Sequence, residues 1–75
     1  MSTTVNRFGE KLRSLRREKK LTLSQLAVAL GYATHTYISE IETGKKQPTV
    51  DFVLSVADFF DVTTDILLRD KLNLS

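Results

Sequence analysis

Apolar residues recur along this chain every three to four positions, the spacing that aligns side chains on one face of an α-helix. In the first such segment, Val5, Phe8, Leu12 and Leu15 follow one another at intervals of three, four and three residues. The same pattern along the chain predicts five helices and no strands, and therefore an all-α fold. The predicted helices span Asn6–Lys19, Thr22–Leu30, His35–Glu42, Val50–Phe60 and Thr63–Arg69.

Each of the remaining predicted helices also carries an apolar face, and together these faces would form one shared core. Leu23 stands at the edge of its face, where we expect it to be half-buried. The expected core residues after the first helix are Leu26, Ala27, Leu30, Ile38, Ile41, Val53, Val56, Ala57, Phe60, Ile66 and Leu67.

Polar residues and glycines mark where these helices begin and end. Thr22 and Gln25 have the spacing of a capping box, in which each side chain bonds the other residue's backbone N–H. Gly31 is a candidate C-cap because glycine adopts the left-handed conformation at little cost. Further cap candidates are Thr34, Thr49 and Thr63, and Gly44 is expected to end the third helix.

The segment from Thr22 to Pro48 is the most informative part of the chain. It contains two short predicted helices joined by a turn that includes Gly31, and it ends with Gly44, two lysines and a proline. This is the organisation of a helix-turn-helix, which places its second helix in the DNA major groove. The pattern therefore predicts a DNA-binding unit made from the second and third helices.

Composition narrows the class of protein further. The 75 residues fit one domain, predicted over residues 6–70, with tails at 1–5 and 71–75. There is no cysteine and a single histidine, so neither a disulfide framework nor a zinc site is expected. No apolar run has the length of a membrane span and the N-terminus is not a signal peptide, so a cytoplasmic protein is expected.

The net charge of +2 conceals an uneven distribution along the chain. Residues 1–20 hold seven basic and two acidic side chains, whereas residues 48–75 hold two basic and five acidic ones. A basic half attracts a polyanion and an acidic half turns away from it, so the charge could orient the protein on DNA. A solvated, charged first helix explains the same pattern equally well.

The ordered motifs along the chain resemble the Cro/repressor-like helix-turn-helix superfamily, often called the Xre family. The resemblance covers nearly the whole chain and implies a compact five-helix, lambda-repressor-like DNA-binding domain. It is carried by Phe8-Gly-Glu-Lys-Leu-Arg-Ser-Leu-Arg16, Leu21-Thr22, Gln25-Leu-Ala27, Leu30-Gly31, Tyr37-Ile-Ser-Glu-Ile-Glu42, Gly44-Lys-Lys-Gln-Pro48 and Val56-Ala57 through Leu67-Leu68.

Two positions depart from the family pattern. Leu23 stands where the family has a glutamine that reaches the DNA backbone, so that contact would be lost or taken over by Ser24 or Gln25. The turn with Tyr32 and Ala33 is one residue longer than the commonest version, which affects how the third helix would meet the bases.

The outward face of the third helix carries the candidate base-reading residues. Threonine can contact a thymine methyl group, histidine can donate to a purine N7 or O6, and glutamate can accept from the cytosine N4 amine. A solvated helix surface is the alternative interpretation. The resemblance assigns base-reading positions to His35, Thr36 and Glu40, and the full candidate set is Thr34, His35, Thr36, Ser39 and Glu40.

Affinity for DNA would come mainly from phosphate contacts. Backbone N–H groups at helix starts beside Thr22 and Thr34 attract anions because they lack partners within the helix. Tyr37 could reach a phosphate or could instead shield the core. The candidate phosphate contacts are Thr22, Ser24, Gln25, Tyr37, Lys45 and Lys46.

The resemblance further implies a structural ion pair between Arg16 and Glu42, which would tie the first helix to the third. A homodimer is also implied, because family members often bind paired half-sites one helical turn apart. Phe52 and Phe59 lie seven residues apart, outside the minimal core stripe, although they could also complete a small core. The proposed dimer interface is Phe59, Ile66, Leu68, Leu72 and Leu74.

Three classes of function follow from these observations. The leading one is a transcription regulator, a repressor or autoregulator that binds double-stranded DNA as a dimer on an inverted repeat. The alternative is an antitoxin or another protein-interaction module that uses the helix-turn-helix for autoregulation. An enzyme is not expected, because the chain has no glycine-rich phosphate loop, cysteine nucleophile or second histidine. No cofactor, metal or small-molecule ligand is expected.

Overall fold

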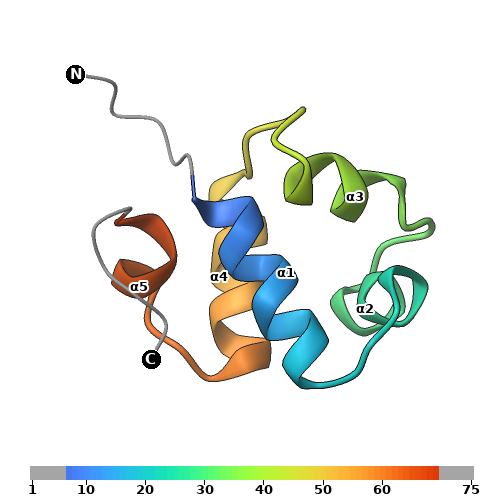
Figure 1. Ribbon diagram of the computed structural model, residues 1–75, viewed down its shortest axis with the longest axis horizontal. Coiled ribbons are helices and arrows are strands. Elements are labelled where there is room, and N and C mark those ends of the chain that lie inside the picture. The colour runs from blue at the N-terminus through green and yellow to red at the C-terminus, as the bar shows by residue number, and fades with distance from the viewer. Residues whose placement is uncertain (1–6, 70–75) are drawn as a thin grey trace.

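The computed structural model describes residues 7–69, and within this range the chain forms five helices and no strand (Figure 1). The all-α prediction is therefore confirmed, and the helix bounds agree with it to within about two residues, the usual uncertainty of a helix end. None of these helices is long and apolar enough to cross a membrane. The helices are α1 (Phe8–Glu18), α2 (Leu23–Leu30), α3 (Thr36–Glu42), α4 (Val50–Phe60) and α5 (Thr64–Leu68).

Three of the predicted threonine caps are present. The hydroxyl oxygens of Thr22, Thr49 and Thr63 each accept a hydrogen bond from the backbone N–H three residues later, at 3.1–3.2 Å. The Gln25 side chain also accepts from the backbone N–H of Thr22 at 2.9 Å, which completes the capping box. Gly31 has φ of 87° and ends α2 in the left-handed conformation as predicted.

The cap predicted at Thr34 is wrong. The residue before α3 is His35, whose ψ of −3° places it in the right-handed helical region, and its side chain makes no capping bond. A threonine cap needs an extended backbone, as at Thr22, where ψ is 166°. The turn therefore leaves Thr34 one position too far from the helix, and α3 begins at Thr36.

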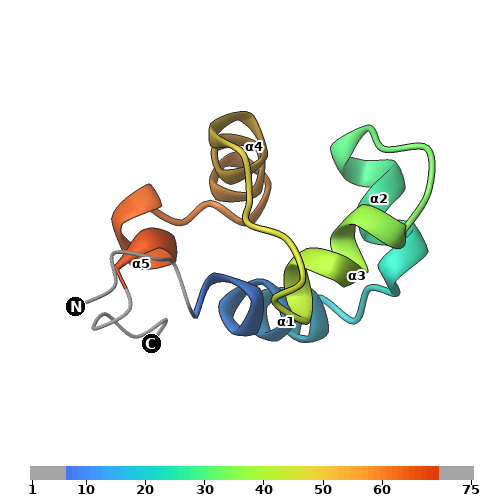
Figure 2. The same cartoon turned by 90° about the horizontal axis from the view of Figure 1, so that it is seen from above.

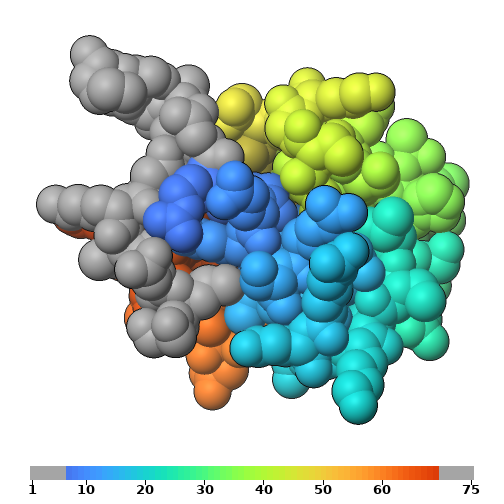
Figure 3. All heavy atoms as spheres, viewed as in Figure 1, coloured from blue at the N-terminus to red at the C-terminus, as the bar shows by residue number. Residues whose placement is uncertain are grey.

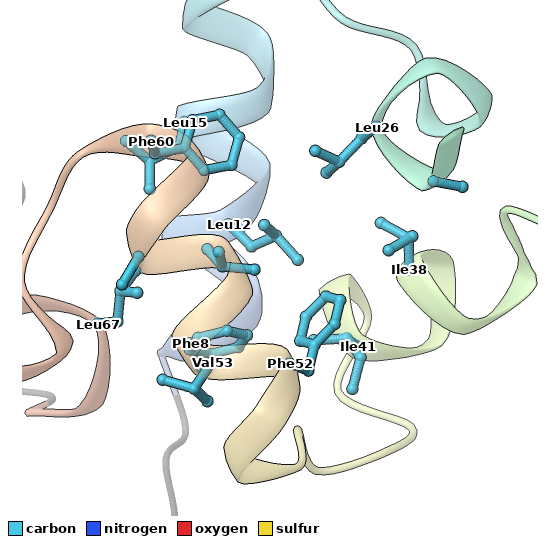
Figure 4. Close-up of a cluster of buried hydrophobic side chains, with 13 residues drawn as sticks. Phe8, Leu12, Leu15, Leu26, Ile38, Ile41, Phe52, Val53, Phe60 and Leu67 are labelled. Carbon is cyan, nitrogen blue, oxygen red and sulfur yellow. The ribbon is translucent and has the colours of Figure 1, made fainter. Parts of the chain in front are cut away.

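The core fills the space between α1 and α4, with α2 and α3 on one side and α5 on the other (Figures 2 and 4). Leu12, Ile38 and Leu67, from three different helices, are fully buried within it. Leu23 is partly buried against this core, as predicted. Val5 lies outside the described residues. The buried hydrophobic residues are Phe8, Leu12, Leu15, Leu26, Ala27, Ile38, Ile41, Phe52, Val53, Val56, Ala57, Phe60 and Leu67.

Phe52 corrects the sequence interpretation, which placed it outside the core stripe of α4. Its side chain is 0% exposed, and its ring packs edge-to-face against the ring of Phe8, with 6.1 Å between centroids. The rings of Tyr32 and Tyr37 also meet it edge-on. The buried face of α4 is broad rather than narrow, as is common for a helix in a globular core.

The backbones of α1 and α3 approach each other closely at Gly9. A Cβ atom at this position would overlap the carbonyl oxygens of Ile41 and Glu42 at the end of α3. Because backbone oxygens cannot move aside as a flexible side chain can, any larger residue would push the two helices apart. Gly9 therefore fixes how closely the third helix is seated against the first.

Lys11 is a buried charged side chain that the sequence analysis counted only among the basic residues. It lies on the inward face of α1 and is 2% exposed. Its ammonium group donates to the carbonyl oxygen of Ile66 and, at 2.7 Å, to that of Arg69. A cation at the carbonyl end of a helix is favourable, since these carbonyl groups have no partner within the helix. Lys11 thus attaches the end of α5 to α1.

Candidate nucleic-acid interface

The helix-turn-helix unit consists of α2, the turn 31–35 and α3, which lie together along one side of the molecule in the space-filling view (Figure 3). The capping box fixes the start of α2, and Gly31 reverses the chain at its end. The backbone N–H of Tyr32 then donates to the carbonyl oxygen of Ala27 at 2.8 Å. These local bonds position α3 beside α2 without a side-chain cap of its own.

The two sides of α3 differ sharply. Ile38 and Ile41 point into the core and are almost fully buried. The predicted base-reading residues lie on the other side of the unit: Thr34, His35 and Thr36 are exposed, whereas Ser39 and Glu40 are partly exposed.

Thr34, His35 and Thr36 also line a shallow, open hollow between α2 and α3, together with Ser24 and Val28. Val28 is 76% exposed, and the sequence analysis did not single it out. The sequence already indicates that Val28 is exposed, because position 28 lies outside the apolar face formed by Leu26, Ala27 and Leu30. An apolar side chain outside the apolar face has no packing role in the core.

The predicted phosphate-contacting residues fall into two groups in the structure. Thr22 and Gln25 form the capping box at the start of α2, with Ser24 exposed beside them. Lys45 and Lys46 follow α3, where Gly44 has φ of 83° and turns the chain back. The backbone N–H of each lysine donates to the carbonyl oxygen of Glu40, at 2.8 and 3.3 Å, so both lysines are held close to the outward side of α3.

Tyr37 lies within an aromatic cluster rather than on the surface of α3. Its ring stacks on that of Tyr32 at 5.2 Å between centroids and meets the ring of Phe52 edge-on at 5.1 Å. Its hydroxyl oxygen is buried and has no hydrogen-bond partner among the described residues. Of the two interpretations left open by the sequence, this placement favours a cover for the core over a phosphate contact. Burial is the main cause that raises the pKa of the Tyr32 phenol above its ordinary value, and the nearby Tyr37 and Asp51 raise it further.

Arg16 and Glu42 form a bidentate ion pair between α1 and the end of α3. Arg16 Nε donates to Glu42 Oε2 at 2.7 Å and Nη2 donates to Oε1 at 3.2 Å, while Nη1 donates to the Leu21 carbonyl oxygen at 2.8 Å. The side chains of Arg16 and Glu42 are only 12% and 5% exposed. Arg13 approaches the same carboxylate at 3.9 Å, a contact that the sequence did not reveal.

The family model described as a helix-turn-helix domain matches residues 7–70 of this chain. The chain belongs to the Cro/repressor-like helix-turn-helix (Xre) family. The resemblance described above is thereby confirmed, together with the lambda-repressor-like fold.

Curated relatives of this helix-turn-helix chain are transcription regulators. The chain is 46% identical over 64 residues to the HTH-type transcriptional activator BcrR of Enterococcus faecalis, covering 85% of this chain and 31% of BcrR. It is 34% identical over 65 residues to the HTH-type transcriptional regulator SinR of Bacillus subtilis, covering 85% and 58%. The chain thus spans only part of the length of these relatives.

Solved structures of the family have the same arrangement of helices. The N-terminal DNA-binding domain of SinR from Bacillus subtilis superposes with a TM-score of 0.78 at 33% identity, covering 88% of this chain and 96% of that one. SinR in complex with DNA gives a TM-score of 0.74 at 33% identity, covering 83% and 98%.

The proposed dimer residues of this helix-turn-helix domain lie away from α3. Phe59 and Leu68 are 37% and 40% exposed, and Ile66 is partly buried. Leu72 and Leu74 lie outside the described residues. The structure adds an apolar groove between α4 and α5 that the sequence analysis missed, lined by Gln47, Pro48, Val50, Val53, Leu54, Thr64 and Leu68.

The described residues contain no group of three or more histidine, cysteine or acidic side chains that could hold a metal ion. The single histidine, His35, is exposed at the start of α3. The family to which the chain belongs consists of DNA-binding transcription regulators.

Proposed function

We propose that this chain is a sequence-specific transcription regulator that binds double-stranded DNA and reads the major groove with α3. The observation that supports it best is the two-sided structure of α3. Its inner side is fixed to α1 by Gly9 and by the Arg16–Glu42 pair, while Thr34, His35 and Thr36 are exposed. A rigidly seated helix with free polar side chains is what direct base readout requires.

The proposed contacts divide into base-reading and phosphate-binding sets. His35 and Thr36 lie at the exposed N-terminal end of α3, the part of a recognition helix that meets base edges. Lys45, on the turn after α3, and the backbone N–H groups at the start of α2 are proposed to hold the phosphates on either side. The role that we propose is that of a repressor or autoregulator, which would block a promoter by occupying it.

Selection from a random duplex library, followed by binding across a salt series, tests this proposal. The wild-type chain should select a short inverted repeat. The His35→Ala/Thr36→Ala variant should lose roughly 10-fold or more in preference for it, because each good base contact contributes about 1–3 kcal/mol of discrimination. The salt slope should stay unchanged, since it counts phosphates rather than bases.

A Lys45→Ala variant provides the opposite control. It should weaken binding to every duplex and lower the salt slope by about 0.9, with the selected sequence unchanged. Weak binding without sequence preference in both the wild type and the double variant would overturn the proposed function.

We further propose a homodimer that places two copies of α3 on the inverted repeat, with Phe59, Ile66 and Leu68 at the interface. Leu68 also lines the apolar groove between α4 and α5, and exposed apolar patches mark interaction sites. Sedimentation should show a dimer at high micromolar concentration, and Leu68→Glu should shift it to monomer. Val28→Glu, at an exposed apolar residue on α2, should leave the dimer intact. A wild-type chain that remains monomeric would refute the dimer.

A protein-interaction role, such as that of an antitoxin, is the second candidate. The α4–α5 groove favours it, because Val50 and Leu54 are 75% and 50% exposed on that surface. Sequence-blind DNA binding combined with a monomeric chain would point to this role.

A further inference from the structure

Glu40 presents an electrostatic problem for a helix that reads DNA. Of the two acidic residues on α3, Glu42 is buried against Arg16, whereas the Glu40 side chain is 31% exposed on the outward side. DNA carries one negative charge per about 1.7 Å of helix axis, so an isolated carboxylate on this side would be repelled. A nearby cation that offsets this charge and holds the side chain in place would therefore favour a base contact by Glu40.

Lys46 occupies the required position. Its Nζ atom lies 3.3 Å from Glu40 Oε1, and its backbone N–H donates to the Glu40 carbonyl oxygen at 3.3 Å. The same ammonium group lies 5.9 Å from the centroid of the Tyr37 ring, within the range of a cation–π contact. Because the aromatic cluster fixes that ring, the two contacts hold the Lys46 ammonium group beside α3, although 56% of the side chain is exposed.

Lys45, the neighbouring residue, differs in this respect. It is exposed, and within residues 7–69 its side chain forms no ion pair, hydrogen bond or ring contact. Two adjacent lysines on one turn therefore have different surroundings. Lys45 can move freely to a phosphate, whereas a phosphate contact by Lys46 would compete with Glu40 for the same ammonium group.

We propose that Lys46 is a positioning residue for sequence specificity: it orients the Glu40 carboxylate and offsets its charge, so that Glu40 can accept a hydrogen bond from a cytosine amine. This inference rests on the proposed function, because it names the residue that makes one of the base contacts possible. The ion pair itself is exposed and contributes little to folding, since such pairs contribute at most about 1 kcal/mol. Removing Lys46 should therefore alter DNA recognition without unfolding the protein.

The test compares Lys46→Met and Lys45→Met on the selected duplex and on its single base-pair variants. Lys45→Met should weaken binding to all duplexes by the same factor. Lys46→Met should lose about 10-fold in discrimination at one base pair, the one at which Glu40→Gln also loses discrimination, within the range of a single base contact. Combining Lys46→Met with Glu40→Gln should add nothing further at that base pair. Lys46→Arg should retain the discrimination.

Each alternative outcome has a definite meaning. A uniform loss in Lys46→Met, like that in Lys45→Met, would make Lys46 a phosphate contact and overturn the inference while the proposed function stands. No position-specific effect of Glu40→Gln would also overturn it. A wild-type chain without sequence preference would overturn both. Thermal unfolding of each variant, expected to match the wild type, shows that the differences arise in binding.

Discussion

Replacing Glu42 by alanine should lower the free energy of unfolding by about 3 kcal/mol or more, because removing one partner of a buried ion pair leaves the other charge uncompensated. The Glu42 carboxylate is 5% exposed and accepts two bonds from Arg16. Without it, the Arg16 guanidinium would remain between α1 and α3 with only the Leu21 carbonyl oxygen as its acceptor. Chemical denaturation followed by circular dichroism measures the change.

Glu10→Ala is the matched control for this experiment. Glu10 lies on α1 and pairs with Arg7 at 3.8 Å, but its side chain is 74% exposed. Its loss should change stability by less than about 1 kcal/mol, as for most surface ion pairs. A Glu42→Ala protein that is as stable as the wild type but fails to bind DNA would show that Glu42 acts in recognition rather than in folding.

Replacing Lys11 by methionine should also destabilise the protein, by about 2–3 kcal/mol, since hydrogen bonds from a charged donor contribute about 1.5–3 kcal/mol each and part of that is offset by the desolvation of the buried ammonium. Methionine keeps much of the aliphatic length, so the core remains filled. What it removes is the donor to the carbonyl oxygens of Ile66 and Arg69. We expect α5 to loosen first, seen as faster amide hydrogen exchange at Leu67 than in the wild type.

Arg17→Met separates this effect from a general change in charge. Arg17 lies on the same helix and is exposed, so its replacement should alter stability by no more than about 0.5 kcal/mol. Unchanged stability in Lys11→Met, together with unchanged exchange in α5, would mean that the two carbonyl groups are satisfied equally well by water.

The five helices could be predicted from the sequence because the spacing of apolar residues and the cap residues indicate the same helix at each place. Apolar spacing places the faces, and the threonines at positions 22, 49 and 63 mark three helix starts. Thr34 was a misleading cap candidate: threonine is a common cap residue, but the turn places His35 directly before α3, and only the conformation of the turn decides which residue stands there. The burial of Lys11 could have been predicted from the sequence. Lys11 falls on the same face as Phe8, Leu12 and Leu15, where a charged residue needs a buried partner.

The candidate site was less predictable than the fold. The Arg16–Glu42 contact came from the family resemblance, since the two residues are 26 positions apart and periodicity alone does not join them. The Glu40–Lys46 pair depends on the turn after Gly44, and the burial of the Tyr37 hydroxyl depends on how the rings of Tyr32 and Phe52 pack around it. Such contacts arise from the path of the chain between helices, which residue spacing within a helix does not encode.

The division of α3 into an anchored inner side and a free outer side bears on how such proteins diverge. Exchanging exposed residues such as His35 and Thr36 should change the free energy of folding by no more than about 0.5 kcal/mol, whereas Gly9 and Glu42 tolerate little change. Under the proposed function, new operator preferences can arise by successive single substitutions, each of which leaves the protein folded. A scaffold of this kind can give rise to many regulators within a single genome, each of which binds its own operator and not the operators of the others.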